Sequence, residues 1–117
     1  MKLIESDIAR HYSTMQIRTA SRHKQLCMLH DKCVEHITVA CTTTSGPHKR
    51  DRLDKAQNIL SQFQSALPIK DHISQSLFYL YDYCYVILES DSNENCAKAL
   101  SVMKILRDTF RTLLLSK

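Results

Sequence analysis

The chain is nearly free of the two residues that shape tight turns. Glycine occurs once, as Gly46, and proline twice, as Pro47 and Pro68. Folds rich in β-turns need both residues repeatedly, because glycine accepts positive φ angles and proline presets φ at turn positions. A chain of 117 residues with so few of them favours long helices joined by short connections. We therefore expect an all-α fold.

Helical periodicity divides the sequence into an N-terminal arm, residues 1–18, and four longer segments. Bundle helices are expected at about 21–42, 49–66, 70–90 and 92–115. Four long helices with short links most simply form an antiparallel four-helix bundle, here as a single domain over residues 1–117. The arm is expected to be a short helix or an extended segment.

Polar residues mark where the helices are expected to begin. Ser21 is the predicted N-cap of the first bundle helix, and Asp71 or a neighbour opens the third. Asp91, with Glu94 three residues on, is a plausible cap and capping box for the fourth.

Three of the helices show apolar stripes that predict the core. These stripes consist of Leu26, Leu29, Cys33, Val34, Ile37 and Ala40 in the first helix; Leu53, Ala56, Ile59, Leu60, Phe63 and Leu67 in the second; and Cys96, Ala99, Met103, Leu106, Phe110 and Leu113 in the fourth.

The stretch "SLFYLYDYCYVILES", residues 76–90, alternates tyrosine with other residues in the manner of a strand. A helix fits better, because helical spacing gathers one core stripe of Ile73, Leu77, Leu80, Cys84 and Leu88. Tyr81 and Tyr85 then border the core, with Phe78 beside them.

Tyr79 and Tyr83 point the other way on this helix, together with Val86. A helix that is apolar nearly all round is buried on more than one side, so the arm or a partner is expected to cover these residues. The plainer interpretation leaves the two tyrosines on the surface with their hydroxyls in water.

Composition and the N-terminus indicate a cytoplasmic protein. The formal charge of +4 is mildly basic, and no apolar run is long enough for a membrane span. Glu5 and Asp7 lie where a signal peptide needs an apolar stretch. The five cysteines include no C-x-x-C pair, so reduced thiols that act as small core hydrophobes are expected.

Enzyme motifs are absent from the sequence: a Gly-rich phosphate loop, G-x-S-x-G and H-E-x-x-H do not occur. The first bundle helix has a cysteine or histidine at every third position: Cys27, His30, Cys33 and His36. On a helix this spacing spreads the four side chains around half of the circumference, too far apart to bind one metal ion. Cys33 is expected in the core and the histidines at its edge or in solvent. No catalytic, cofactor-binding or metal site is expected.

The basic run "HKRDRLDK", residues 48–55, is the one candidate for nucleic-acid binding. Two aspartates interrupt it and no aromatic residue lies within it, so it is interpreted as a solvated helix start.

Several motifs together resemble one family. Tyr12 stands seven residues before "TASRHKQLCMLHD", "KAQNIL" follows at 55–60, "LYDYCY" at 80–85 and "LRDTF" at 106–110. In this order and over almost the whole chain they resemble the flagellin-specific export chaperones of bacterial flagella, the FliS family. The chain departs from the family pattern at Arg22, where the family has proline, at His30 and Lys32, at Phe110 in place of tryptophan, and in the compact "ALPIKDH" before the third helix.

The resemblance implies a non-enzymatic chaperone that binds the disordered C-terminal segment of flagellin in grooves between its helices. It would prevent premature polymerisation and deliver flagellin to the export-gate component FlhA. In the family the segment around the matching tyrosine covers part of the groove, a role that falls here to Ile8, Tyr12, Ile17 and also Met15. The predicted partner-binding residues are Ile8, Tyr12, Ile17, Tyr79, Tyr83, Val86, Val102 and Ile105.

Two alternatives share the fold: a chaperone or adaptor for a different export substrate, and an unrelated structural bundle. The free protein is expected to be a monomer or weak dimer, with no nucleic-acid partner and no direct membrane insertion.

Overall fold

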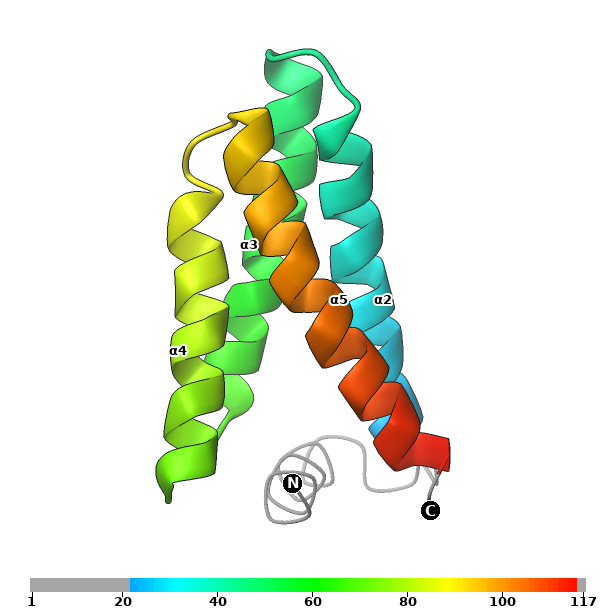
Figure 1. Ribbon diagram of the computed structural model, residues 1–117, viewed down its shortest axis with the longest axis vertical. Coiled ribbons are helices and arrows are strands. Elements are labelled where there is room, and N and C mark those ends of the chain that lie inside the picture. The colour runs from blue at the N-terminus through cyan, green and yellow to red at the C-terminus, as the bar shows by residue number, and fades with distance from the viewer. Residues whose placement is uncertain (1–21, 116–117) are drawn as a thin grey trace.

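The computed structural model describes residues 22–115 and the side chains of residues 24–112. This part of the chain forms four helices, α2 (Arg22–Cys41), α3 (Pro47–Ala66), α4 (His72–Ile87) and α5 (Asn93–Leu115). They run alternately up and down, with short connections at the two ends (Figure 1). α2 and α4 each pack against both α3 and α5. The predicted all-α antiparallel four-helix bundle is confirmed, and the tyrosine-rich stretch is helical as far as Ile87.

The rare turn residues lie at the helix ends. Gly46 precedes α3 with φ 142°, a backbone conformation that glycine alone adopts without strain. Pro47 follows at the first helical position, where its missing N–H would have had no helical partner. α3 ends at Ala66, one residue before Leu67 and two before Pro68.

The predicted stripes of α2, α3 and α5 meet in one core. Every member with a described side chain is buried except Leu29, which is half-buried against the core. The side chain of Leu113 and the predicted cap Ser21 lie outside the described residues. Ridge-into-groove packing of these stripes therefore sets how the helices lie against each other.

α4 begins with the predicted Asp71 cap. The Asp71 carboxylate accepts the Ser74 backbone N–H at 2.9 Å, and the Ser74 hydroxyl accepts the Asp71 N–H at 3.1 Å. This capping box satisfies two backbone donors at the helix start. The hydrogen bond from the Ser74 backbone also holds the pKa of Asp71 below its ordinary value, because it stabilises the charged carboxylate.

α5 is capped by Ser92, so the predicted Asp91 cap is wrong. The Ser92 hydroxyl accepts the Asn95 N–H at 3.1 Å, and the Ser92 carbonyl accepts the Cys96 N–H at 3.0 Å. The helix begins at Asn93. A cap must immediately precede the first helical residue, and only Ser92 does so.

Ser92→Ala is therefore expected to lower the free energy of unfolding by about 1 kcal/mol, through loss of this cap. Asp91→Ala is the matched control and should change it by less than about 0.5 kcal/mol. Urea unfolding followed by circular dichroism measures both, and equal losses in the two variants would contradict the assignment.

The basic start of α3 is only partly solvated, in contrast to the prediction: His48, Asp51, Asp54 and Lys55 are exposed, but Lys49 and Arg50 have partners within the protein. Lys49 is only 2% exposed, and its ammonium donates to the Asn93 side-chain oxygen at 2.7 Å. Arg50 donates to the backbone oxygens of Leu88, at 3.1 Å, and Glu89, at 3.3 Å. The prediction failed for these two residues because the first turn of α3 packs against the connection between α4 and α5.

Two amides complete the attachment of this end of α4. The Gln57 side chain on α3 donates to the Tyr85 carbonyl at 2.9 Å, and the Asn95 side chain on α5 donates to the Ile87 carbonyl at 2.9 Å. The last carbonyls of a helix have no intrahelical partner, so side chains from both neighbouring helices satisfy them here.

Candidate functional site

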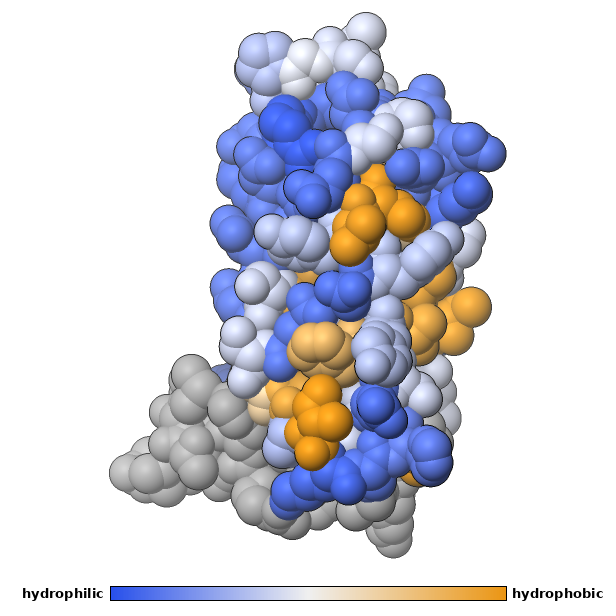
Figure 2. Space-filling view, turned by 90° about the vertical axis from the view of Figure 1, so that its left-hand side faces the viewer, coloured by the Kyte–Doolittle hydropathy of each residue, from blue (hydrophilic) through white to orange (hydrophobic). Residues whose placement is uncertain are grey.

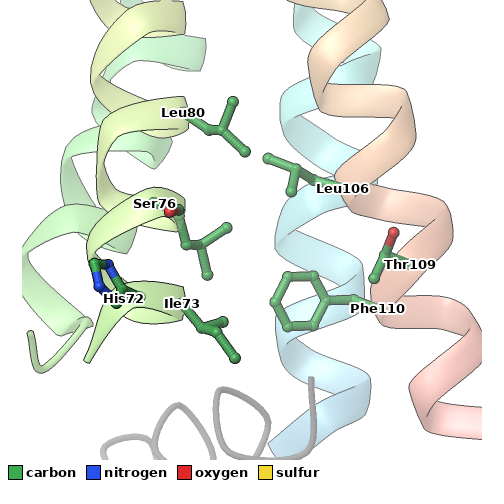
Figure 3. Close-up of a pocket in the computed structure, with 8 residues that line it drawn as sticks. His72, Ile73, Ser76, Leu80, Leu106, Thr109 and Phe110 are labelled. Carbon is green, nitrogen blue, oxygen red and sulfur yellow. The ribbon is translucent and has the colours of Figure 1, made fainter. Parts of the chain in front are cut away.

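A groove of about 330 Å³ opens between the first half of α4 and the second half of α5. The two helices are close together at their connecting loop and diverge toward the other end (Figure 1). Figure 3 shows the α4 side chains facing those of α5 across the opening. The lining of this α4–α5 groove is mostly apolar and consists of His72, Ile73, Ser76, Leu77, Leu80, Leu106, Thr109 and Phe110.

The α4 wall of the groove corrects one prediction. Ile73 and Leu80, expected in the core, are 38% and 40% exposed. Leu77 and Cys84 of the predicted stripe, and Leu88 just after the helix, are buried as predicted, and the other core-facing residues of α4 are Ser74 and Tyr81. Tyr81 takes the inward position that Leu80 was expected to hold, because its hydroxyl has a hydrogen-bonding partner there. Two large aliphatic side chains are thereby left on the groove wall.

That partner is His30, whose ring stacks on the groove residue Phe110. The His30 ring is fully buried between Phe63 and Phe110, with ring centroids 4.3 and 4.7 Å away. Its Nδ1 is 2.9 Å from the Leu26 carbonyl oxygen, and its Nε2 is 2.9 Å from the Tyr81 hydroxyl. A carbonyl oxygen only accepts, so Nδ1 carries the hydrogen of the neutral ring and Nε2 accepts from Tyr81.

Burial lowers the pKa of His30 to about 4, since the charged imidazolium is disfavoured away from water. The sequence placed this histidine at the core edge or in solvent, and that expectation is wrong. Its surroundings come from α3, α4 and α5, at positions 33 to 80 residues away along the chain. No local pattern in α2 signals them.

The groove continues into exposed apolar surface. On α4, Tyr79, Tyr83 and Val86 are 60%, 44% and 53% exposed, and on α5 Ile105 is 66% exposed. We call these four residues the outer face. Figure 2, which looks onto the side that carries α4, shows hydrophobic residues exposed in a broken band along the molecule.

Helical spacing connects the outer face to the groove walls. Tyr83 follows Leu80 by three residues, and the half-buried Val102 precedes Leu106 by four, so both extend the walls toward the α4–α5 loop. The exposure of Tyr79, Tyr83 and Val86 agrees with the accessible surface that the sequence predicted. Their role in binding stays a prediction. The other predicted partner-binding residues, Ile8, Tyr12 and Ile17, lie outside the described residues.

The cysteines and histidines spaced by three residues on α2 (Cys27, His30, Cys33 and His36) each contact different neighbours. The Cys33 thiol points to the Ala56 carbonyl, and His36 Nδ1 is 3.1 Å from an Arg52 nitrogen. Between residues 22 and 115, no three His, Cys, Asp or Glu side chains come together as a metal site. Within the same range, no helix has both the length and the apolar character to cross a membrane.

The fold and this surface define a class: a small all-α bundle with an open apolar groove, the kind of surface used in helix-in-groove recognition. The particular family follows from comparison. A family model described as "Flagellar protein FliS" matches residues 5–115, and the chain belongs to the FliS family. This is a family of flagellar export chaperones of flagellin. Comparison with curated proteins and with solved structures finds no match.

Proposed function

We propose that this protein is a non-enzymatic export chaperone that holds the C-terminal segment of flagellin as a helix along the α4–α5 groove. The observation that carries the proposal is the open groove itself, whose walls expose Ile73 and Leu80 to solvent. Exposed apolar surface of this kind on a soluble domain favours a binding role. An amphipathic helix would place its apolar side chains between the two walls.

The proposal extends to the protein's place in export. The chaperone acts in the cytoplasm as a single domain, free as a monomer or weak dimer, and delivers its client to FlhA. Membership of the FliS family supports this part. In the free protein the groove would be covered by the N-terminal residues Ile8, Tyr12 and Ile17. This part of the proposal rests on the family resemblance alone.

Calorimetric titration with the C-terminal segment of the host's own flagellin tests the proposal. One-to-one binding with a negative heat-capacity change is expected, because apolar surface on both partners leaves water. Tyr12→Ala should bind the segment more tightly if the arm competes for the groove. No binding by the folded protein would contradict the flagellin assignment and favour a different export substrate.

Removing the two exposed tyrosines is expected to separate binding from stability. Tyr79→Ala combined with Tyr83→Ala should weaken flagellin binding about tenfold or more, since aromatic anchors carry much of the energy of an interface. The same change should leave thermal stability nearly unchanged, because both rings are largely exposed.

Three controls surround this double variant. The corresponding Phe double variant keeps both rings and should bind nearly as well as the parent. Gln62→Ala alters an exposed position of α3 away from the groove and should change neither property. Leu77→Ala removes a buried side chain and should cost about 2–5 kcal/mol of stability. A large stability loss in the tyrosine double variant would show instead that these rings are structural.

A further inference from the structure

α4 carries a carboxylate on its exposed side that has no ion-pair partner among the described residues. Asp82 lies in the second half of the helix and is exposed. Its side chain accepts one long hydrogen bond, of 3.4 Å, from the Gln64 side-chain amide on α3. No lysine or arginine occurs within α4. The charge of Asp82 is therefore left to water or to a binding partner.

The other carboxylates within the four helices are all paired. Each lies within 4.0 Å of a lysine or arginine nitrogen: Asp31 with Arg111, Glu35 with Lys32 and Arg52, Asp51 with Lys55, Asp54 with Arg50, Glu94 with Lys98, and Asp108 with Arg107. The chain has an excess of cations, with a formal charge of +4, and still none of the described cations pairs with Asp82. An unpaired carboxylate on such a surface attracts a positively charged group of a partner.

Two exposed tyrosines flank this carboxylate. Tyr79 precedes Asp82 by three residues, about one helical turn, and Tyr83 follows it directly. Side chains three apart on a helix are neighbours, with Cβ atoms about 5–6 Å apart. The Tyr79 ring also packs at right angles to the Phe78 ring, with centroids 6.1 Å apart and an interplanar angle of 80°. A flat cation can therefore lie over a tyrosine ring and reach the Asp82 carboxylate at the same time.

Among cationic side chains, arginine fits this arrangement best. Its guanidinium is planar and weakly hydrated, donates two parallel hydrogen bonds to a carboxylate, and stacks on the face of an aromatic ring. A lysine ammonium is a compact and strongly hydrated charge, so it gains less from the rings. A phosphate group is repelled by the carboxylate, which weighs against a nucleic-acid partner at this face.

We propose that Tyr79, Asp82 and Tyr83 form a recognition site for one arginine side chain of the flagellin segment, an inference that rests on the proposed function. The guanidinium pairs with the Asp82 carboxylate and stacks on a tyrosine ring. We call these three residues the arginine site. It lies on α4 beside the groove wall formed by Leu80.

The arginine site supplies what the groove lacks. No residue that lines the groove is a lysine, arginine, aspartate or glutamate. Apolar contacts have no preferred direction, so a helix held by them alone can shift by one turn along the groove. A charged contact beside the groove fixes the register of the bound helix. The site therefore determines where along α4 the segment stops.

Calorimetric titration of the full chain with the C-terminal segment of the host's own flagellin tests the site. Asp82→Asn should weaken binding about threefold to tenfold, as loss of an exposed charge pair and its ring contact does. It should also reduce the salt dependence of binding between about 0.05 and 0.5 M. Asp51→Asn is the matched control, because it removes an exposed carboxylate from α3, and it should bind like the parent. Tyr79→Phe keeps the ring and should also bind like the parent.

The partner arginine is found by replacing each arginine of the segment with glutamine. One replacement should weaken binding to the parent protein as much as Asp82→Asn does. The same replacement should have little further effect on binding to Asp82→Asn, because two changes that remove one contact are not additive.

Segment binding that is equally tight in Asp82→Asn and the parent would overturn the arginine site and leave the proposed function standing. Absence of segment binding by the folded parent would contradict the proposed function and the site together. Tighter binding by Asp82→Asn would overturn the site in favour of an arginine of the chain's own N-terminal residues. A parent dimer that Asp82→Asn dissociates, seen by sedimentation equilibrium, would overturn it in favour of a second copy. Circular dichroism of each variant confirms that it is folded.

Discussion

Replacement of Phe63 by alanine is expected to lower the free energy of unfolding by about 3–5 kcal/mol, among the largest effects available in this bundle. The ring is 3% exposed and stacks on His30, at 4.3 Å, and on Tyr81, at 4.9 Å between centroids. Its removal leaves a cavity beside the rings of His30 on α2 and Tyr81 on α4, which are too rigid to fill it. It also exposes one face of a histidine whose neutral form depends on a dry environment.

Urea unfolding of Phe63→Ala, followed by circular dichroism, measures this loss. Gln62→Ala, one position earlier on α3 and exposed, changes helix propensity but removes no packing, and it should stay within about 0.5 kcal/mol of the parent. A loss below about 1 kcal/mol for Phe63→Ala would contradict the stacked arrangement of the three rings.

Acidification is expected to destabilise the protein through His30, by roughly 3 kcal/mol between neutral pH and pH 4. In the unfolded chain His30 takes up a proton near its ordinary pKa of 6.5, but in the folded protein only near 4. The unfolded state therefore binds more protons within this window. Stability is full above the unfolded pKa, falls as the pH drops from 6.5, and stops falling from this source below about 4.

Urea unfolding at a series of pH values gives the slope of stability against pH. His30→Leu should remove most of the slope between pH 6.5 and 4. Slopes are compared instead of absolute stabilities, because this variant also loses the hydrogen bond to Tyr81. His36→Gln is the comparison variant and should remove a smaller part of the slope, because burial and the neighbouring Arg52 lower the pKa of His36 as well but by less than that of His30. An unchanged slope in His30→Leu would assign the acid sensitivity elsewhere.

The sequence alone predicted the class of fold, the four helices and nearly all of the core in α2, α3 and α5. Those features follow from local information, namely the spacing of apolar residues and the scarcity of turn residues. The family was also recognisable, because its motifs occur in order along the chain.

The groove was less accessible to prediction because α4 is apolar nearly all round. The spacing of apolar residues could not decide which of two adjacent positions, 80 or 81, faces the core. Leu80 was therefore assigned to the core and Tyr81 to its border. The choice between them depends on His30, 51 residues away, whose ring nitrogen accepts the Tyr81 hydroxyl. Lys49 was missed for the same reason, since its partner Asn93 lies 44 residues further along.

The two ends of α4 are held differently, and this bears on how freely the groove can be reshaped. At its C-terminal end, Arg50, Gln57 and Asn95 fasten backbone carbonyls to α3 and α5. Its first turns are held by their own Asp71 cap and by apolar packing, which has no fixed direction. None of these three side chains lines the groove, which opens beside the other end of α4. The α4 wall of the groove can therefore be reshaped by substitution without removing any of the three attachments.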